Sequence, residues 1–166
     1  RLLRHRPRPV PHGVRMSEHS AESVGAGRVG FTGTREGMTD AQRAKVNRLL
    51  RELAPIWAHH GDCVGADDQF HDLAKLAGAK IMIHPPEKPD LRAFRLGDDI
   101  APEKPYASSN ADIVNATAYL IACPKESSVQ YRGGTWHTVH YAERRALPVV
   151  IVWPDGSTHS DGGVRG

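Results

Sequence analysis

Five short apolar segments alternate along this chain with stretches of helical periodicity, and this alternation constrains the fold more than any other feature. The apolar segments cover residues 28–32, 55–58, 80–84, 118–123 and 149–153. Between them, apolar residues recur three and four positions apart, as in the series Phe70, Leu73, Ala74 and Ala77, which is the spacing of one helical face. Strands that alternate with helices predict a three-layer α/β domain in which helices cover both faces of a mainly parallel sheet.

Local signals place the ends of the predicted helices. Thr39 followed by Gln42 has the pattern of a capping box, so a helix is expected to begin at Thr39. Gly78 is expected to end the second helix, because glycine is favoured just after a helix. Ser109 is expected to cap a short third helix that runs to about Ala116.

Four loops rich in glycine or proline follow predicted strands, at residues 33–37, 61–67, 85–107 and 124–134. The carboxyl ends of parallel strands meet at one edge of a sheet, so all four loops should project from that edge. Ligands of open α/β sheets bind outside this edge, where the strand order reverses. The sequence therefore predicts one ligand cleft built by these loops.

The stretch from His60 to His71 contains the turn from the second strand into the second helix, with glycines at Gly61 and Gly65. Glycine lets a backbone turn sharply and lets a ligand approach it, and N–H groups at a helix start attract anions. We interpret this turn as a phosphate- or ribose-binding site, or else as a plain strand-to-helix connection that needs glycine. The sequence has neither a Gly-x-Gly-x-x-Gly nor a Walker motif, which disfavours classical dinucleotide and triphosphate sites.

The positive charge of the chain is concentrated at its start. Five of the 22 basic residues lie in positions 1–15, which hold no acidic residue, so the remainder has 17 basic and 19 acidic residues. Residues 1–27 lack periodicity and are predicted to be a flexible leader, with Met16 as an alternative true start. The domain is expected over 28–153, followed by a flexible tail at 154–166.

Charge and composition also exclude classes of partner. No apolar run approaches the length of a transmembrane helix, so no membrane is expected as a partner. The slightly acidic body argues against a dedicated nucleic-acid surface. Cys63 and Cys123 are too few for a disulfide framework and fit a reducing compartment, so a cytoplasmic location is expected.

Four motifs then follow one another in a distinctive order. They are Gly33-Thr34-Arg35 after the first strand, His60-Gly61-Asp62-Cys63-Val64-Gly65-Ala66-Asp67 after the second, Asn110 in the third helix region and Gly133-Gly134-Thr135 before the fourth helix. Over about residues 28–153 this order resembles the SLOG superfamily of Rossmann-like proteins, which includes YspA-related proteins, the DNA-processing protein DprA and the Lonely Guy enzymes. The resemblance is greatest to the small YspA-like proteins. It implies that the chain binds or senses a nucleotide or a nucleotide-derived ligand.

The motifs and their flanking residues define the expected ligand site. Its members are Gly33, Thr34, Arg35, Gly61, Asp62, Gly65, Asp67, Asn110, Arg132, Gly133, Gly134 and Thr135. Arg35 and, by the same argument, Arg132 are cations beside glycines, which suits a phosphate. Asp67 either hydrogen-bonds a ribose or complements the dipole of the helix that it begins.

A second function class stays open, that of a Lonely Guy-type hydrolase acting on nucleoside 5′-monophosphates. Those enzymes carry a catalytic arginine and a glutamate, whereas this chain has Ser109 where relatives usually have arginine and Thr138 in place of the glutamate. Glycoside cleavage needs a carboxylate nearby, and Asp62 and Asp67 are the remaining candidates. DNA binding in the manner of DprA is disfavoured by the acidic body.

Other reactive residue types carry less weight. Cys63 is read as a buried thiol rather than a reactive one, and Trp136 either stacks on a base or packs in the core. The histidine spacings match no common zinc signature, so neither a metal site nor a cofactor is expected. The sequence leaves a homo-oligomer open.

Overall fold

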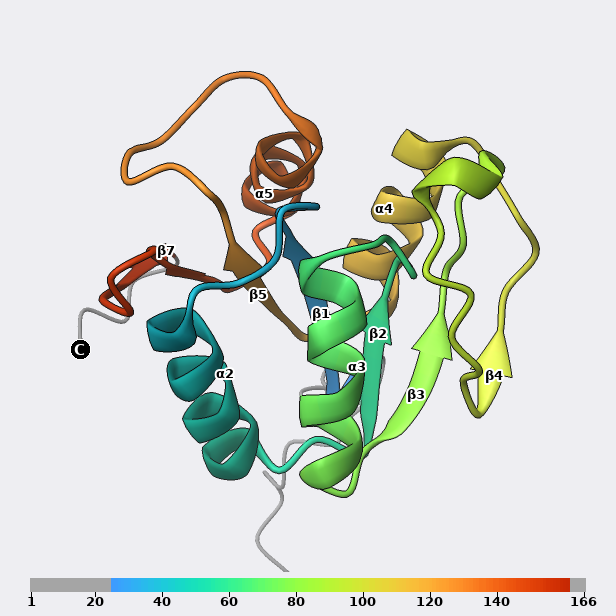
Figure 1. Ribbon diagram of the computed structural model, residues 1–166, viewed down its shortest axis with the longest axis horizontal. Helices are drawn as coiled ribbons and strands as arrows, with labels where there is room; N and C mark the ends of the chain where they lie inside the picture. The colour runs from blue at the N-terminus through green and yellow to red at the C-terminus, as the bar shows by residue number, and fades with distance from the viewer. Residues whose placement is uncertain (1–24, 162–166) are drawn as a thin grey trace, which may run out of the picture.

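The computed structural model describes residues 25–161, which form a seven-stranded sheet packed against helices (Figure 1). The strands are β1 (Arg28–Gly33), β2 (Trp57–His60), β3 (Lys80–Ile83), β4 (Asp99–Ile100), β5 (Tyr119–Cys123), β6 (Val149–Val152) and β7 (Thr158–Asp161). The helices are α2 (Asp40–Leu53), α3 (Ala66–Leu76), α4 (Tyr106–Ala116) and α5 (Gly134–Arg144), with a short 3-10 helix, η1 (Pro89–Leu91). The predicted α/β class is confirmed.

The sheet has the strand order β4-β3-β2-β1-β5-β6-β7. All neighbouring pairs from β4 to β6 are parallel, and only β7 runs antiparallel, along β6. The chain therefore builds outward from β1 on one side and returns to place β5 on its other side. The point where the order reverses lies between the carboxyl ends of β1 and β5, which is where the ligand site of such a sheet is expected.

Two apolar cores lie on opposite faces of the sheet. On the face covered by α2 and α3, Phe31 and Phe70 stack with their ring centroids 4.3 Å apart. On the face covered by α4 and α5, Trp136 packs with Ile113 and Leu120. The expected three layers are present, and Trp136 is a core residue that is only 1% exposed.

Several local predictions are confirmed. Thr39 and Gln42 form the capping box at the start of α2, with reciprocal side-chain to backbone hydrogen bonds of 3.1 and 3.0 Å. Gly78 follows α3 with a φ of +85°, a conformation that glycine adopts at little cost.

The predicted start of the third helix is wrong. α4 begins at Tyr106 after Pro105, so Ser109 lies inside the helix rather than at its cap. The Ser109 side chain is buried, and its hydroxyl donates to the carbonyl of Pro85 at 2.9 Å. A tertiary contact with the preceding loop thus replaces the local capping contact that the sequence suggested.

The outer boundaries of the domain also differ from the prediction. The expected C-terminal tail contains β7, which pairs with β6 through backbone hydrogen bonds. The residues of β7 are polar, so the sequence there shows no alternation of apolar residues that would predict a strand. The long loop at 85–107 contains η1 and the edge strand β4. Residues 1–24 and 162–166 lie outside the described residues, while Gly27 accepts a 2.8 Å hydrogen bond from the Ile56 N–H and so belongs to the domain.

Candidate functional site

A cavity of about 350 Å³ opens at the point where the strand order reverses. It is lined by the loop after β1, the loop after β5, the first turn of α5 and the start of α4. The lining residues are Gly33, Thr34, Arg35, Glu36, Tyr106, Lys125, Glu126, Gly133, Gly134, Thr135 and Trp136. The cavity therefore brings together the first and the last of the sequence motifs, which are about a hundred residues apart in the chain.

The loop after β1 is held in place by backbone contacts. The Thr34 N–H donates to Cys123 O at the end of β5, and Thr34 O accepts from the Ala66 N–H at the start of α3, both at 3.0 Å. Gly33 allows this close packing, because a Cβ there would lie 2.6 Å from the Cβ of Ala66. Backbone hydrogen bonds thus join the loop to the end of β5 and to the start of α3.

The start of α5 is open to the cavity. Its N-cap residue, Gly133, has a φ of +107°, and no side chain in the described part of the protein makes a capping hydrogen bond there. The first N–H groups of a helix have no partner within the helix and carry a partial positive charge. Gly134 lies against Tyr106 so closely that any Cβ at this position would overlap the tyrosine ring. A small anion fits the arrangement at this helix start.

Two cations and two carboxylates lie around the cavity. Lys125 and Glu36 form an exposed ion pair of 3.4 Å, and the Glu126 carboxylate accepts a 2.9 Å hydrogen bond from the Trp136 indole N–H. Arg35 is exposed and makes no hydrogen bond or ion pair with the residues described at 25–161. It is therefore the cation at this cavity that is available to a ligand.

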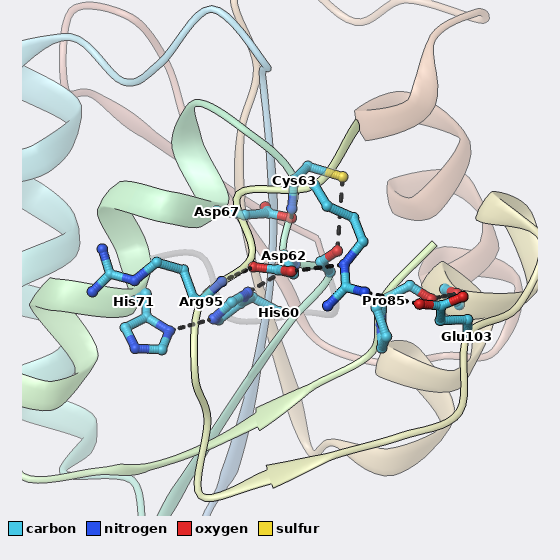
Figure 2. A network of polar contacts seen from close by, with 11 residues as sticks. His60, Asp62, Cys63, Asp67, His71, Pro85, Arg95 and Glu103 are labelled. Atoms are coloured by element: carbon cyan, nitrogen blue, oxygen red, sulfur yellow. Dashed lines mark hydrogen bonds and ion pairs between the residues drawn. The ribbon is translucent and has the colours of Figure 1, made fainter. Parts of the chain in front are cut away.

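The turn between β2 and α3 does not line the cavity, although the sequence placed four ligand residues in it. Asp62 is fully buried in a left-handed conformation with a φ of +56°. Its carboxylate accepts from Arg92 Nε at 3.0 Å. It also accepts from the Arg95 N–H at 2.9 Å, a contact that is drawn in Figure 2. Both oxygens of Asp62 thus hold the 85–107 loop in place.

Gly65 has a structural reason that the sequence did not reveal. Its φ is +90°, and a Cβ there would overlap the backbone of Arg35. The space beside the Gly65 α-carbon is filled by the backbone of the loop after β1. A larger residue would displace the loop that carries Arg35.

Asp67, Gly61 and Asn110 lie together beneath the surface. A Cβ built on Gly61 would be 3.2 Å from the Asp67 carboxylate and 3.7 Å from the Asn110 side-chain oxygen. Burial raises the pKa of Asp67 to about 7, against the opposing effect of backbone hydrogen bonds such as the 3.1 Å bond from the Cys63 N–H. The amide nitrogen of Asn110 is buried and has no hydrogen-bond partner among residues 25–161. This group adjoins the cavity through Tyr106, one helical turn before Asn110, but does not line it.

Cys63, Arg132 and Thr138 do not line the cavity. Burial raises the pKa of the Cys63 thiol far above its usual range, so the thiol is protonated and unreactive. Arg132 is exposed in the loop after β5 and does not line the cavity. Thr138, which replaces the catalytic glutamate of the Lonely Guy enzymes, is buried, and its hydroxyl donates to Gly134 O at 2.9 Å.

Four histidines form two buried pairs. His59 Nδ1 lies 2.8 Å from His84 Nε2, and His60 Nε2 lies 2.9 Å from His71 Nδ1. Burial lowers the pKa of His59 to about 3 and that of His84 to about 4, so both rings are neutral at physiological pH. Within residues 25–161, no group of three or more histidine, cysteine or acidic side chains is arranged to hold a metal ion.

Sequence reasoning missed four residues that line the cavity: Glu36, Tyr106, Lys125 and Glu126. Lys125 and Glu126 come directly after the end of β5, so the rule that placed the other loops at this edge could have found them. Tyr106 had no such signal, since it lies in a segment that reads as a proline-rich loop.

The strand order and the position of the cavity define a Rossmann-like α/β domain, and comparison with solved structures supports this fold. A molybdenum cofactor binding protein from the phototrophic bacterium Rippkaea orientalis is 19% identical to this chain. The two structures align over 76% of each chain with a TM-score of 0.58. The molybdenum cofactor carrier protein MCP from Chlamydomonas reinhardtii is also 19% identical, covers 75% of this chain and 74% of its own, and has a TM-score of 0.55.

DNA processing protein A (DprA) from Streptococcus pneumoniae has the same fold, with 16% identity and a TM-score of 0.56 over 75% of this chain and 49% of that protein. The fold-level resemblance predicted from the motifs is therefore confirmed. No protein-family model matches the sequence, and no curated protein sequence matches it. Across residues 25–161, the structure contains no helix long and apolar enough to cross a membrane.

Proposed function

We propose that this protein binds or senses a nucleotide or nucleotide-derived ligand, whose phosphate group lies between Arg35 and the start of α5. The observation that carries the proposal is the uncapped Gly133-Gly134-Thr135 turn, which faces the same cavity as Arg35, an arginine that makes no ion pair within residues 25–161. Backbone N–H groups supply directed hydrogen bonds to a phosphate, and a guanidinium supplies charge and bidentate contacts. The position of the cavity at the strand-order reversal adds independent support.

Several ligands of this class are candidates for the site. Two proteins of the same fold are described as binding or carrying the molybdenum cofactor, so that cofactor belongs among the ligands to be tested beside nucleotides. DNA is not proposed as a ligand, because residues 16–166 have more acidic than basic residues, and phosphate-backbone binding depends on clustered positive charge.

The direct test is a binding screen by thermal shift and calorimetry with nucleoside monophosphates, cyclic nucleotides and the molybdenum cofactor. A ligand that binds the native state raises its melting temperature by mass action. Inorganic phosphate should compete with the bound ligand, since both would occupy the start of α5. A ligand that binds tightly without competition from phosphate would place the site elsewhere.

A second candidate function is hydrolysis of the base–ribose bond, and one observation favours it. Glu36 and Glu126 are carboxylates at the cavity, whereas Asp62 and Asp67 are turned into the protein. A carboxylate beside the bound ribose is what an oxocarbenium-like transition state requires. The test is incubation with AMP and detection of free adenine. Adenine released by the wild type and not by Glu126→Gln would establish the hydrolase and displace the binding-only proposal.

A further inference from the structure

A second cavity lies directly beside the first. It has a volume of about 440 Å³, and it is lined by Arg35, Pro86, Glu87, Lys88, Leu91, Pro105 and Tyr106. Arg35 and Tyr106 line both cavities, so these two side chains form the wall between them. Each volume falls within the range of about 300–1,000 Å³ that is usual for small-molecule sites.

The second cavity differs from the first in its chemistry. Pro86, Leu91 and Pro105 give it an apolar wall, and Tyr106 adds an aromatic ring, whereas the first cavity is built largely from glycines and polar residues. The tyrosine ring is flat and the proline rings are rigid, so both can pack against the face of a flat ring. Glu87 and Lys88 are exposed and lie at its polar side.

The apolar wall is held in place before any ligand binds. The Val64 N–H donates to Leu91 O at 2.9 Å, and the Glu87 N–H donates to Lys104 O at 2.8 Å. Asp62 holds the following residues through Arg92 Nε and the Arg95 N–H. A wall that is ordered in advance costs a ligand little conformational entropy.

We infer that the two cavities are the two halves of one ligand site, which takes a phosphomonoester bearing a flat, largely apolar ring system. The phosphate occupies the first cavity, the ring occupies the second, and Arg35 and Tyr106 contact the ligand between them. This inference rests on the proposed function and narrows it. It excludes cyclic nucleotides, whose phosphate is a diester, and it predicts weaker binding of simple sugar phosphates, because they have no group to fill the second cavity.

The experiment compares AMP, GMP and riboflavin 5′-phosphate with ribose 5-phosphate by calorimetry on the full chain. At least one ring-bearing compound should bind wild type tenfold or more tightly than ribose 5-phosphate. Leu91→Gln, which makes the wall polar at nearly constant size, and Glu87→Trp, which fills the cavity from an exposed position, should each reduce that advantage at least fivefold. Neither should change the affinity for ribose 5-phosphate. Leu76→Gln is the matched control, because Leu76 is 83% exposed and lines neither cavity.

The outcomes separate this inference from the function beneath it. If ribose 5-phosphate binds and no ring-bearing compound binds more tightly, the phosphate site stands and the ring site is overturned. The ring site is also overturned if the advantage survives both cavity variants undiminished. If none of these compounds and no inorganic phosphate binds, the proposed function and the inference fall together.

Discussion

The buried carboxylate of Asp62 accepts a hydrogen bond from Arg92 Nε at 3.0 Å, and this contact joins the turn after β2 to the loop that forms the second cavity. The Asp62 side chain is completely buried, and that of Arg92 is 12% exposed. Removing one partner from a buried pair leaves the other charge without compensation. The pair therefore connects the stability of the domain to the shape of the site.

Asp62→Ala is expected to lower the free energy of unfolding by about 3 kcal/mol, because Arg92 loses its buried partner and keeps only the exposed Glu103, and the Arg95 N–H loses its acceptor. Urea denaturation followed by circular dichroism measures the change. Asp72→Ala is the matched control, since Asp72 pairs with Arg95 at an exposed position and should contribute less than about 1 kcal/mol. Equal losses in the two variants would show that burial does not govern these pairs.

Gly65→Ala and Gly133→Ala test two glycines that share a positive φ but differ in their surroundings. A backbone with a φ of +107° and a ψ of 152° is adopted essentially only by glycine, and this strain alone is expected to lower the free energy of unfolding of Gly133→Ala by about 1–3 kcal/mol. Gly65→Ala should lower the free energy of unfolding clearly more, because its Cβ would overlap the Arg35 backbone. A Cβ at Gly133 would meet only a Trp136 carbon, at 4.0 Å. Thermal unfolding of both variants is the measurement, and a smaller loss at Gly65 would contradict the packing.

Arg35→Ala is expected to weaken AMP binding about ten- to a hundredfold, which corresponds to a lost charge-assisted contact of roughly 1.5–3 kcal/mol. Adenosine, which has no phosphate, should lose little affinity. Arg35→Lys should recover only part of the AMP affinity, because a point charge cannot replace the guanidinium fork. Arg48→Ala, at an exposed position on α2, is the control. Equal weakening of AMP and adenosine would mean that Arg35 supports the loop and not the phosphate.

The buried pair of His59 and His84 predicts loss of stability in mild acid. Their folded-state pKa values of about 3 and about 4 lie below the unfolded value of 6.5, so below pH 6.5 the unfolded chain takes up protons that the folded chain does not. Stability should fall by about 1.4 kcal/mol per pH unit for each histidine between pH 6 and pH 4.5. The double variant His59→Gln/His84→Gln should show a flatter profile in urea titrations across this range.

Asp67 acts in the opposite direction over the same range. Its folded-state pKa of about 7 lies above the unfolded value of 3.8, so its contribution to stability is fully present below pH 3.8 and is lost as the pH rises toward 7. Asp67→Asn should therefore gain stability relative to wild type as the pH rises from 4 to 7. A constant difference between the two proteins over that range would show that Asp67 is ionised in the fold.

The order of strands and helices could be predicted from the sequence because it depends on local chemistry. The apolar segments, the Thr39–Gln42 capping box and Gly78 after α3 each specify their conformation within a few residues. The rule that parallel strands end at one edge then placed Gly33, Thr34, Arg35 and the Gly133–Thr135 turn around one cavity.

Only the tertiary structure decided which of the remaining polar residues face that cavity and which hold the fold together. Asp62 and Asp67 look alike in sequence, but the direction of a side chain after a strand depends on what packs against the turn. Here the 85–107 loop covers Asp62, and the Asp67 side chain is buried inside the protein. Tyr106 lines the cavity beside residues that are far from it in the sequence, and β7 pairs with β6 at the edge of the sheet. Such contacts leave no periodic or local signal, because their free energy depends on partners that only the folded chain brings together.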